Sequence, residues 1–309
     1  MIIPCHPRNR PTLPRTLESL KAAADRVGSG ADSVGTDSKR TTASPNVETI
    51  VVEDVETKGL SWARNRGLDQ ATGEIVFFVD ADDTVKADYF RTLVELLEKT
   101  DSDFVLSSTD YAPLKRDYNL EGNAAIRAAM LPAFFGYSFE DAKRWNRGGN
   151  LAELREQGGV WRCAFRREFL MRNGIRFDEN LKLFEDSPFI AECACHAERV
   201  ASTDERVYEY VPNPDGLMSA SMKDDRYWWY KFAALVNRKA IAAKVAKDDA
   251  EREAIMSQFA ASAVLSAMEM LKARRFGDFV RYFKDPFVRK SFRGFPWSIS
   301  RILKSARKS

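Results

Sequence analysis

The chain has 309 residues and a formal net charge of +3, which is too close to balance to indicate a class of partner. A hydrophobic fraction of 44% and a charged fraction of 30% are those of an ordinary soluble globular protein. The length suits one large domain with an extension, or two domains. The sequence contains no run of about eighteen apolar residues, so we expect no membrane-spanning helix.

The first third of the chain alternates apolar, strand-like runs with segments of helical periodicity. Strands are predicted at residues 1–5, 47–54, 73–80 and 102–109. Helices are predicted at residues 12–27, 59–72 and 86–100. This alternation indicates an α/β fold with a mostly parallel sheet and helices on both faces. Residues 28–46 are rich in Gly, Ser, Thr and Asp, and we expect a flexible surface loop there.

The remainder of the chain gives a less regular pattern. The stretch "NAAIRAAMLPAFFGYS" predicts a helix that ends at Pro132, and "VWRCAFRREFLMRNGIRF" predicts a strand followed by a helix that stops at Gly174. A helix preceded by acids is predicted in "FEDSPFIAECACHA". Residues 199–211 predict two short strands around a turn, and from about residue 223 the pattern is helical to the end.

The chain has four cysteines, and no apolar secretory leader precedes them in "MIIPCHPRNR". We therefore expect a reducing, cytoplasmic environment and free thiols. The cluster "CACH", with Cys193, Cys195 and His196, also permits a metal site. It falls in a predicted helix, where side chains two residues apart diverge, so buried thiols are the simpler interpretation.

The stretch "EIVFFVDADDT" runs an apolar strand directly into three acids. Alternate residues leaving a strand point the same way, so Asp80 and Asp82 can face one point. Two hard oxygen ligands suit Mn²⁺ or Mg²⁺, which complete their coordination with water and phosphate. The alternative is a solvated turn. In either case we expect Asp83 to cap the next helix.

Other polar residues are predicted at the same edge of the sheet, where ligands bind in α/β folds. Asp54 ends the second strand, while Arg64 and Asn65 open the following helix. Asn and Asp can bind a nucleobase or ribose, and Arg can neutralise phosphate. Glu185 and Asp186 begin a later helix, where a carboxylate acts as a general base or simply complements the helix dipole.

The order of these motifs resembles that of glycosyltransferase family 2, whose members are inverting enzymes with the GT-A fold. The resemblance covers roughly residues 1–220 and rests on several motifs in order. They are "IIPCHPRNRPTLPRTLESL", "VVED", "KGLSWARNRGLDQATGEIVFFVDADD", "VWRCAFRREFLMRNGIRF" and "FEDSPF".

The resemblance implies a donor site for a UDP-sugar. It implies that Asp54 contacts the uracil, that Pro4 lines the base pocket, and that Asn65 lies by the nucleotide. It further implies that Asp80 faces the ribose and sugar and that Asp82 holds the divalent cation on the diphosphate.

The resemblance also implies a catalytic base, which we place on Asp186 with Glu185 as its neighbour. Trp161 and Asp215 are carried over as candidates for the acceptor or diphosphate loop. The implied reaction is a single displacement in which the deprotonated acceptor hydroxyl attacks the anomeric carbon opposite the diphosphate.

Three features depart from the family pattern. The stretch "VETKG" after "VVED" is short, which puts the shape of the base pocket in doubt. The tyrosine-asparagine pair common after the first strand is His6-Pro7 here. The loop "YVPNPDGLMSAS" lacks the arginine that often touches the diphosphate or acceptor.

We expect a GT-A catalytic domain at residues 1–222, with a nucleotide-sugar half at about 1–112 and an acceptor half at about 155–222. The helical region at 223–309 ends in a tail, 272–309, that carries twelve Lys or Arg, two Asp and eight aromatics. Such a tail favours an anionic membrane surface or a packed helical cap; we expect no nucleic acid. The preceding long helices are expected to pack on the domain or to form a homo-oligomer.

The sequence thus predicts a metal-dependent hexosyl- or N-acetylhexosaminyltransferase acting on a glycan or lipid-linked acceptor in bacterial surface polysaccharide synthesis. It is expected in the cytoplasm, with peripheral attachment to the membrane left open. One alternative is a nucleotidyltransferase that forms nucleotide-sugars, but "IIPCHPRNRP" lacks the glycine-rich phosphate loop that such an enzyme needs. A non-catalytic, membrane-associated scaffold is the other.

Overall fold

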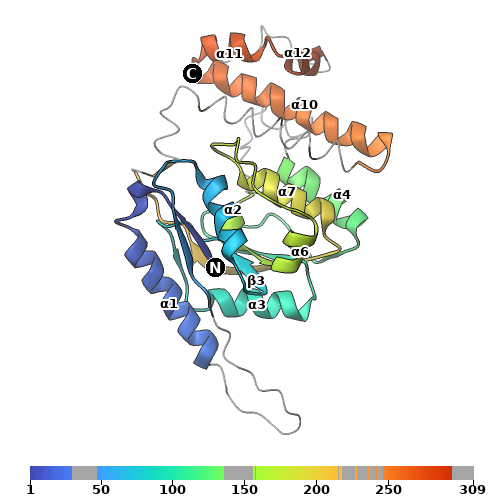
Figure 1. Ribbon diagram of the computed structural model, residues 1–309. Helices are drawn as coiled ribbons and strands as arrows, with labels where there is room; N and C mark the ends of the chain where they lie inside the picture. Colours follow the sequence, from blue (N-terminus) through green and yellow to red (C-terminus); the bar gives the residue numbers. More distant parts are fainter. Residues whose placement is uncertain are drawn as a thin grey trace.

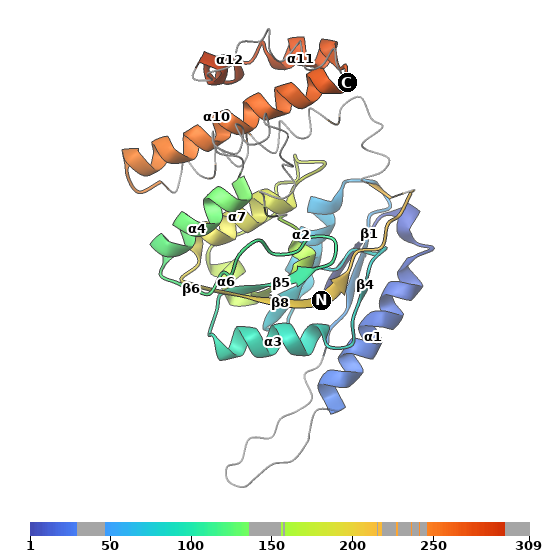
Figure 2. The same ribbon diagram turned by 180° about the vertical axis from the view of Figure 1, so that it is seen from behind.

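The computed structural model shows a central sheet with helices on both faces and further helices beyond one face (Figures 1 and 2). It describes residues 1–29, 47–135, 156, 158–214, 216, 217, 227, 236, 241 and 246–293. Nearly all of the predicted 28–46 loop, residue Asp215 and the tail beyond residue 293 lie outside the described residues.

The N-terminal strands form a parallel unit. Strand β1 (Ile2–Cys5) pairs in parallel with β2 (Ile50–Glu53). Strand β3 (Ile75–Phe77) continues the sheet on the other side of β1, through a parallel bridge between Ile2 and Phe78. All three strands therefore end at the same edge of the sheet, as the alternating pattern predicted.

The rest of the sheet is mixed, so the expectation of a mostly parallel sheet was wrong. Strand β7 (Cys163–Arg166) lies between β3 and β5 (Phe104–Thr109) and runs antiparallel to both. It enters the sheet from the edge at which its neighbours end, so it must run against them. Strand β8 (Arg199–Glu209) is parallel to β5, while β4 (Thr84–Val85) and β6 (Leu120–Glu121) pair antiparallel with β8.

Strand β8 replaces the two short strands and turn predicted for residues 199–211. The register with β5 pairs Ser107 with Thr203 and then Ser108 with Arg206, so the two residues between Thr203 and Arg206 form a bulge. The polar residues that suggested a turn are accommodated as an irregularity within one strand.

The predicted helices are present in the described part of the chain. They are α1 (Leu13–Ser29), α2 (Leu60–Gln70), α3 (Tyr89–Lys99), α4 (Asn123–Phe135), α6 (Arg167–Arg172) and α7 (Asp186–His196). Gly174, with a φ of 62°, follows α6 as expected for a stop signal. Helix α4 continues past Pro132, which the sequence predicted as its end, because a proline in the last turn forfeits only one backbone hydrogen bond.

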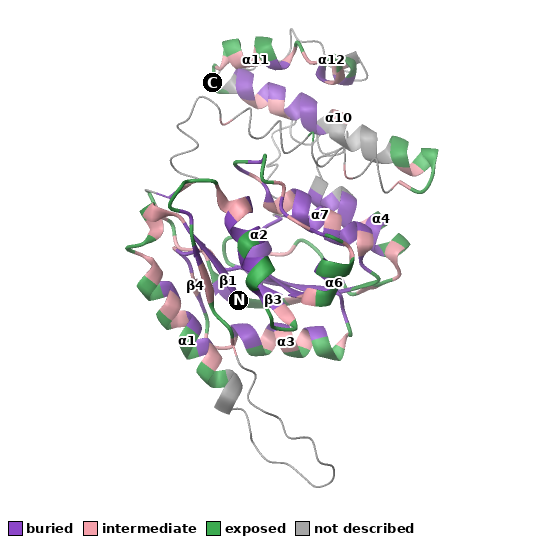
Figure 3. Ribbon diagram, in the orientation of Figure 1, coloured by how far each residue is buried: buried purple, intermediate pink, exposed green. Residues whose placement is uncertain are grey.

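Two apolar clusters cover the two faces of the sheet. Val76 and Phe78 point toward α2, α4, α6 and α7, whereas Phe77 and Val79 point toward α1 and α3. This alternation is the period of two expected of a strand that is buried on both faces. Figure 3 shows the buried residues concentrated on the sheet and on the sheet-facing sides of these helices.

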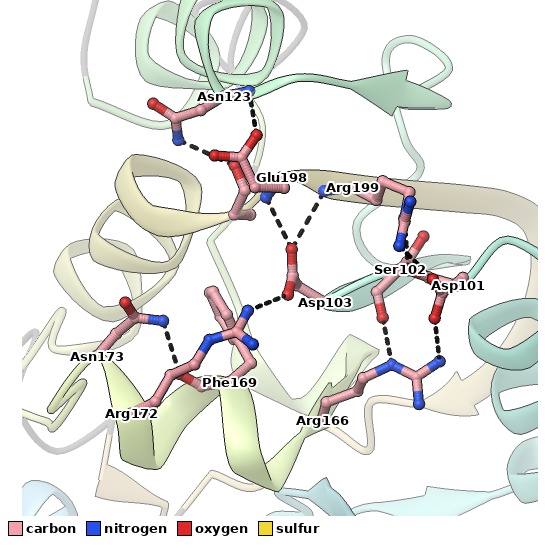
Figure 4. Close-up of polar contacts among 11 residues, drawn as sticks. Asp101, Ser102, Asp103, Asn123, Arg166, Phe169, Arg172, Asn173, Glu198 and Arg199 are labelled. Atoms are coloured by element: carbon pink, nitrogen blue, oxygen red, sulfur yellow. Dashed lines mark hydrogen bonds and ion pairs between the residues drawn. The ribbon is translucent and has the colours of Figure 1, made fainter.

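The amino edge of the sheet is held by a polar network (Figure 4). One carboxylate oxygen of Asp103 accepts a hydrogen bond from Arg172 at 3.0 Å. The other accepts from the backbone N–H groups of Glu198 and Arg199 at 2.7 and 3.1 Å. These bonds fix the start of β8 beside the start of β5 and keep charged groups satisfied at the edge opposite the predicted site.

The C-terminal helices pack against the same core as the sheet. Helix α10 (Asp249–Lys272) begins at the N-cap Asp248 and lies beyond α4 and α7 in both views (Figures 1 and 2). The buried Arg127 of α4 pairs with Glu251 of α10 at 2.9 Å. None of the helices in the described part of the chain combines the length and apolarity needed to cross a membrane.

The described part of the basic tail forms helices α11 (Phe276–Tyr282) and α12 (Pro286–Arg293) against α10. Tyr282 and Val288 are buried, while Arg289 and Lys290 face solvent. This arrangement is that of a packed helical cap as far as residue 293.

All four cysteines are free, as the sequence predicted, and all four are buried. Cys193 and Cys195 lie inside α7, and burial raises the pKa of both thiols above the ordinary cysteine value. Their burial within one helix agrees with the interpretation of "CACH" as buried thiols.

We predict that Gly67→Ala lowers the free energy of unfolding by about 1–2 kcal/mol, although alanine has the better helix propensity. A Cβ at this position of α2 would lie 2.2 Å from Cγ2 of the buried Ile2 on β1. Urea unfolding followed by circular dichroism measures the change. Gly277→Ala on α11 is the matched control, since nothing lies within 4 Å of its Cβ position. A Gly67→Ala variant as stable as the control would contradict the close packing of α2 on β1.

Candidate functional site

The site lies at the edge where β1, β2, β3, β5 and β8 end. Asp54 follows β2 directly and Asp80 lies just beyond β3. Since β7 runs the other way, the short helix η3 (Val160–Arg162) that precedes it lies at this edge too. The first turns of α2 and α7 reach the same place. Residues far apart in the chain thus converge on one region.

A single buried guanidinium joins three carboxylates in this region. Arg64 on α2 is 1% exposed. Its Nη1 donates to Glu185 Oε1 at 2.6 Å and to Asp186 Oδ1 at 2.7 Å, and its Nη2 donates to Asp80 Oδ1 at 2.9 Å. Arg64 therefore ties α2, the end of β3 and the start of α7 together.

The charges of this cluster do not balance. Burial alone would disfavour the charged form of Arg64, but Asp186, Asp80 and Glu185 raise its pKa, so it stays cationic. Burial also raises the pKa of Asp186, to about 8; Arg64 opposes this rise, and Glu185 and Asp80 add to it. One cation facing three acids leaves excess negative charge, and this environment favours a further cation or a proton on Asp186.

Asp82 is the acid best placed to hold such a cation. Its carboxylate is partly exposed and accepts a hydrogen bond from Asn213 Nδ2 at 2.9 Å, and burial raises its pKa. Its backbone carbonyl accepts from Arg15, which fixes the turn. Asp80 and Asp82 offer hard, partly exposed oxygen atoms, a donor set that fits Mn²⁺ or Mg²⁺ with the remaining ligands from water and phosphate.

Asp83 does not cap a helix, so that prediction was wrong. Helix α3 begins at Tyr89, preceded by Asp88. The buried Asp83 instead accepts hydrogen bonds from Tyr208 Oη at 2.6 Å and from the Val211 N–H at 2.8 Å. Burial raises its pKa to about 8, and Asp80 adds to the rise. Asp83 thereby fixes the end of β8 against the acidic turn.

The side chains of Asp54 and Asn65 both bond backbone groups of the chain itself. The buried Asp54 carboxylate accepts from the backbone N–H groups of Lys58 and Gly59, both at 2.7 Å, and closes the short "VETKG" turn. Asn65 binds the N–H and C=O of Phe177 at 3.0 and 2.9 Å and therefore ties α2 to the segment before α7.

Pro4 and Trp161 complete the set of predicted residues. Pro4 lies in β1, where it pairs with Val52 of β2 near the base of the Asp54 turn. Trp161 in η3 is buried and stacks on Tyr208, with ring centroids 4.8 Å apart. The N–H of its neighbour Val160 lies 3.4 Å from Asp186 Oδ2.

The structure thus brings Arg64, Asp80, Glu185 and Asp186 into direct contact, with Asp82 on the same turn. Sequence reasoning missed Asp83, Tyr208 and Asn213 as members of the site. Local pattern carried no signal for them, because they meet across 125 or more residues of chain.

We predict that Arg64→Met lowers the free energy of unfolding by about 3–5 kcal/mol, because it leaves carboxylates buried without their cation. The loss is larger in mildly alkaline than in mildly acidic buffer. Without Arg64 the folded-state pKa of Asp186, which burial already raises, rises further above its unfolded value, so stability falls as pH rises and Asp186 ionises. Urea unfolding at several pH values measures this.

The control for this prediction is Arg66→Met on the same helix. Arg66 is exposed, and its Nη1 lies 3.9 Å from Oδ2 of Asp69. We therefore expect Arg66→Met to lower the free energy of unfolding by no more than about 0.5 kcal/mol. Equal losses for the two variants would contradict the role assigned to Arg64.

Comparison with known proteins places this edge in a family context. Residues 1–173 match the family model described as Glycosyl transferase family 2. The chain is 33% identical over 173 residues to the uncharacterized glycosyltransferase EpsJ of Bacillus subtilis, which covers 53% of this chain and 45% of that protein. It is 22% identical over 213 residues to the poly(ribitol-phosphate) beta-N-acetylglucosaminyltransferase TarS of Staphylococcus aureus, covering 68% of this chain and 33% of that protein. The chain thus spans less than half the length of these curated relatives.

The fold is also that of a solved structure. TarS 1–349 of S. aureus in complex with UDP-GlcNAc superposes with a TM-score of 0.59 at 15% identity, covering 99% of this chain and 90% of that chain. At this identity the likeness concerns the fold alone. It agrees with the GT-A fold that the motif order implied.

Proposed function

Because the chain belongs to glycosyltransferase family 2, we propose that it moves a sugar from a nucleotide-sugar donor to a hydroxyl group of a glycan or lipid-linked acceptor. The observation that carries the proposal is the pairing of Asp186 and Asp80 with one buried arginine, with Asp82 on the same turn as Asp80. Family membership is also what favours sugar transfer over nucleotide-sugar synthesis or a scaffold role.

In this proposal Asp186 is the catalytic base. Its side chain is 19% exposed, whereas that of Glu185 is 7% exposed, so Asp186 is the acid that an acceptor can reach. Its raised pKa makes it a stronger base than an ordinary aspartate. Asp186 removes the proton of the acceptor hydroxyl, whose oxygen forms the new bond to the anomeric carbon. The bond to the diphosphate breaks on the opposite face, and the configuration inverts.

We place the nucleotide at the ends of β1 and β2, beside Pro4, Asp54 and Asn65, with Asp80 toward the ribose and sugar. The support is their common position at one edge of the sheet. The Nη groups of Arg64 are already bonded to carboxylates, so we assign it to holding Asp80 and Asp186 rather than to contact with phosphate.

Asp82 is proposed to hold Mn²⁺ or Mg²⁺. A divalent cation bound there would offset the negative charge that develops on the departing diphosphate. The excess of acids over cations in the cluster supports this assignment. Trp161 is assigned to the acceptor side because it adjoins Val160, the backbone partner of Asp186.

The donor and setting are proposed more broadly. We favour a UDP-linked hexose or N-acetylhexosamine and a role in bacterial surface polysaccharide synthesis. The relative TarS is a poly(ribitol-phosphate) beta-N-acetylglucosaminyltransferase, and its TarS 1–349 structure is a complex with UDP-GlcNAc. We propose residues 1–222 as the catalytic domain and 223–309 as a helical region, in a cytoplasmic protein. Attachment to a membrane surface would then involve residues 272–309.

We predict that Asp186→Asn still binds the nucleotide-sugar but transfers sugar at least about 100-fold more slowly, because the amide cannot accept the hydroxyl proton. Binding is measured by thermal shift across UDP-, GDP- and CMP-sugars with Mn²⁺. Transfer is measured as release of the nucleotide product. The matched control is Glu168→Gln, an exposed acid on α6. Transfer by Asp186→Asn at the rate of the control would remove Asp186 as the base.

A separate prediction concerns the metal. Excess EDTA should abolish transfer, and adding Mn²⁺ or Mg²⁺ should restore it. Asp82→Asn should raise the Mn²⁺ concentration needed for half-maximal rate by about tenfold or more, because one anionic ligand is lost. Full transfer in excess EDTA would show that no divalent cation takes part.

A further inference from the structure

Two stacked tyrosines stand at the same edge of the sheet as the acids. Tyr111 lies just beyond the end of β5 and Tyr210 directly follows β8. These strands are parallel neighbours, so the two residues emerge side by side. Their ring centroids are 4.2 Å apart with an interplanar angle of 24°. Tyr111 is 52% exposed, so one side of the pair is open to solvent.

The pair is joined to the acidic turn through β8. Tyr210 lies between Tyr208 and Val211, and both of these bind Asp83. Burial raises the pKa of Tyr210, and Tyr111, Asp83, Asp82 and Asp80 add to the rise, which is consistent with a ring close to the acids. The stacked tyrosines therefore border the site itself and do not form a remote surface feature.

Another line of contacts connects the same aromatic side to the proposed base. Trp161 stacks on Tyr208, and Trp161 adjoins Val160, whose N–H faces Asp186. Tyr208 thus contacts Trp161 beside Val160, and Tyr210 of the stacked pair follows Tyr208 by two residues at the end of β8. The end of β2, where Asp54 lies, is on the opposite side of β3 in the strand order.

A third aromatic contact involves a residue that lies two positions before the proposed base in the chain. Phe184 immediately precedes Glu185 and has a φ of 64°, a backbone conformation that is costly for a bulky residue and that clusters at functional sites. Its ring packs edge-on against Tyr227 from the C-terminal region, with centroids 5.6 Å apart. Burial raises the pKa of Tyr227, and Glu269 and Tyr111 add to the rise.

We propose that Tyr111, backed by Tyr210, is a stacking platform for a sugar ring of the acceptor. The inference rests on the proposed function and names the acceptor class as a saccharide. One face of a pyranose ring carries C–H groups, which complement the electron-rich face of an aromatic ring. Tyr210 holds the Tyr111 ring in place, so little side-chain freedom is lost on binding. A nucleobase is the less suitable occupant, because the donor is assigned to the β1–β2 side of Asp80.

The test measures saccharide binding by saturation-transfer NMR. The probes are free cellobiose, maltose, lactose and N,N′-diacetylchitobiose, which vary in linkage and in axial hydroxyls. Each is titrated into the full chain and into Tyr111→Ala, Tyr111→Leu and Tyr111→Phe. We expect Ala and Leu to weaken binding by about tenfold or more, since both remove the aromatic face, and Phe to bind within about threefold of the original.

The matched control is Phe276→Ala on α11, which removes an aromatic ring of similar exposure, 54%, away from the site. It should bind the disaccharides as the original chain does. Thermal unfolding of each variant confirms that it is folded, and Tyr111→Leu retains apolar bulk if the alanine variant does not fold.

The proposed platform is contradicted if no disaccharide binds the original chain. It is also contradicted if disaccharide binding is unchanged in Tyr111→Ala and Tyr111→Leu. The same samples are titrated with UDP-, GDP- and CMP-sugars and Mn²⁺. Loss of donor binding in Tyr111→Leu, with disaccharide binding unchanged, would assign the ring to the nucleotide and also overturn the platform. Failure of every nucleotide-sugar to bind the original chain counts against the proposed function, whereas donor binding with Tyr111-independent saccharide binding counts against the platform alone.

Discussion

The contact between Arg64 and three carboxylates is the constraint on which the site depends. A buried guanidinium is costly without anions, and the side chains of Asp80, Glu185 and Asp186 repel one another without a cation. Each part is therefore stable only in the presence of the other. Because the parts come from α2, the end of β3 and the start of α7, one residue couples the positions of three segments.

This constraint explains how acids can be held close together before substrate arrives. One cation does not neutralise three carboxylates, so the cluster keeps negative charge that would favour the proposed divalent cation, and the pKa of Asp186, the proposed base, is raised. The carboxylate of Asp83 is instead occupied by hydrogen bonds from the Tyr208 hydroxyl and the Val211 N–H. The turn after β3 thus carries one acid with a structural role, Asp83, and two acids that we assign to ligand binding, Asp80 and Asp82.

The two sides of this sheet edge present different kinds of side chain. The β2 side presents Asp54, held by backbone N–H groups, whereas the β5 and β8 side presents Tyr111 and Tyr210. The polar groups suit a nucleotide and the aromatic faces suit a saccharide. Asp186 contacts Arg64 of α2 and the N–H of Val160, which precedes β7, the strand between β3 and β5.

Much of this could be predicted from local sequence pattern. Buried strands and amphipathic helices follow from periodicity, and the acids after β2 and β3 were placed at the correct edge. The antiparallel course of β7 could not be predicted, since pairing direction depends on distant strands. The contacts of Arg64 could not be predicted either, because its partners Glu185 and Asp186 lie 121 and 122 residues further along the chain. The sequence alone suggested a phosphate as its partner.

A double-mutant cycle between Arg64→Met and Asp186→Asn tests the central claim most directly. Urea unfolding of the original chain, both single variants and the double variant gives the coupling free energy. If the guanidinium and the carboxylate stabilise each other, the double variant will be more stable than the sum of the single losses allows, by about 1.5 kcal/mol or more. Additive losses, within about 0.5 kcal/mol, would contradict the claim that Arg64 holds Asp186 in place.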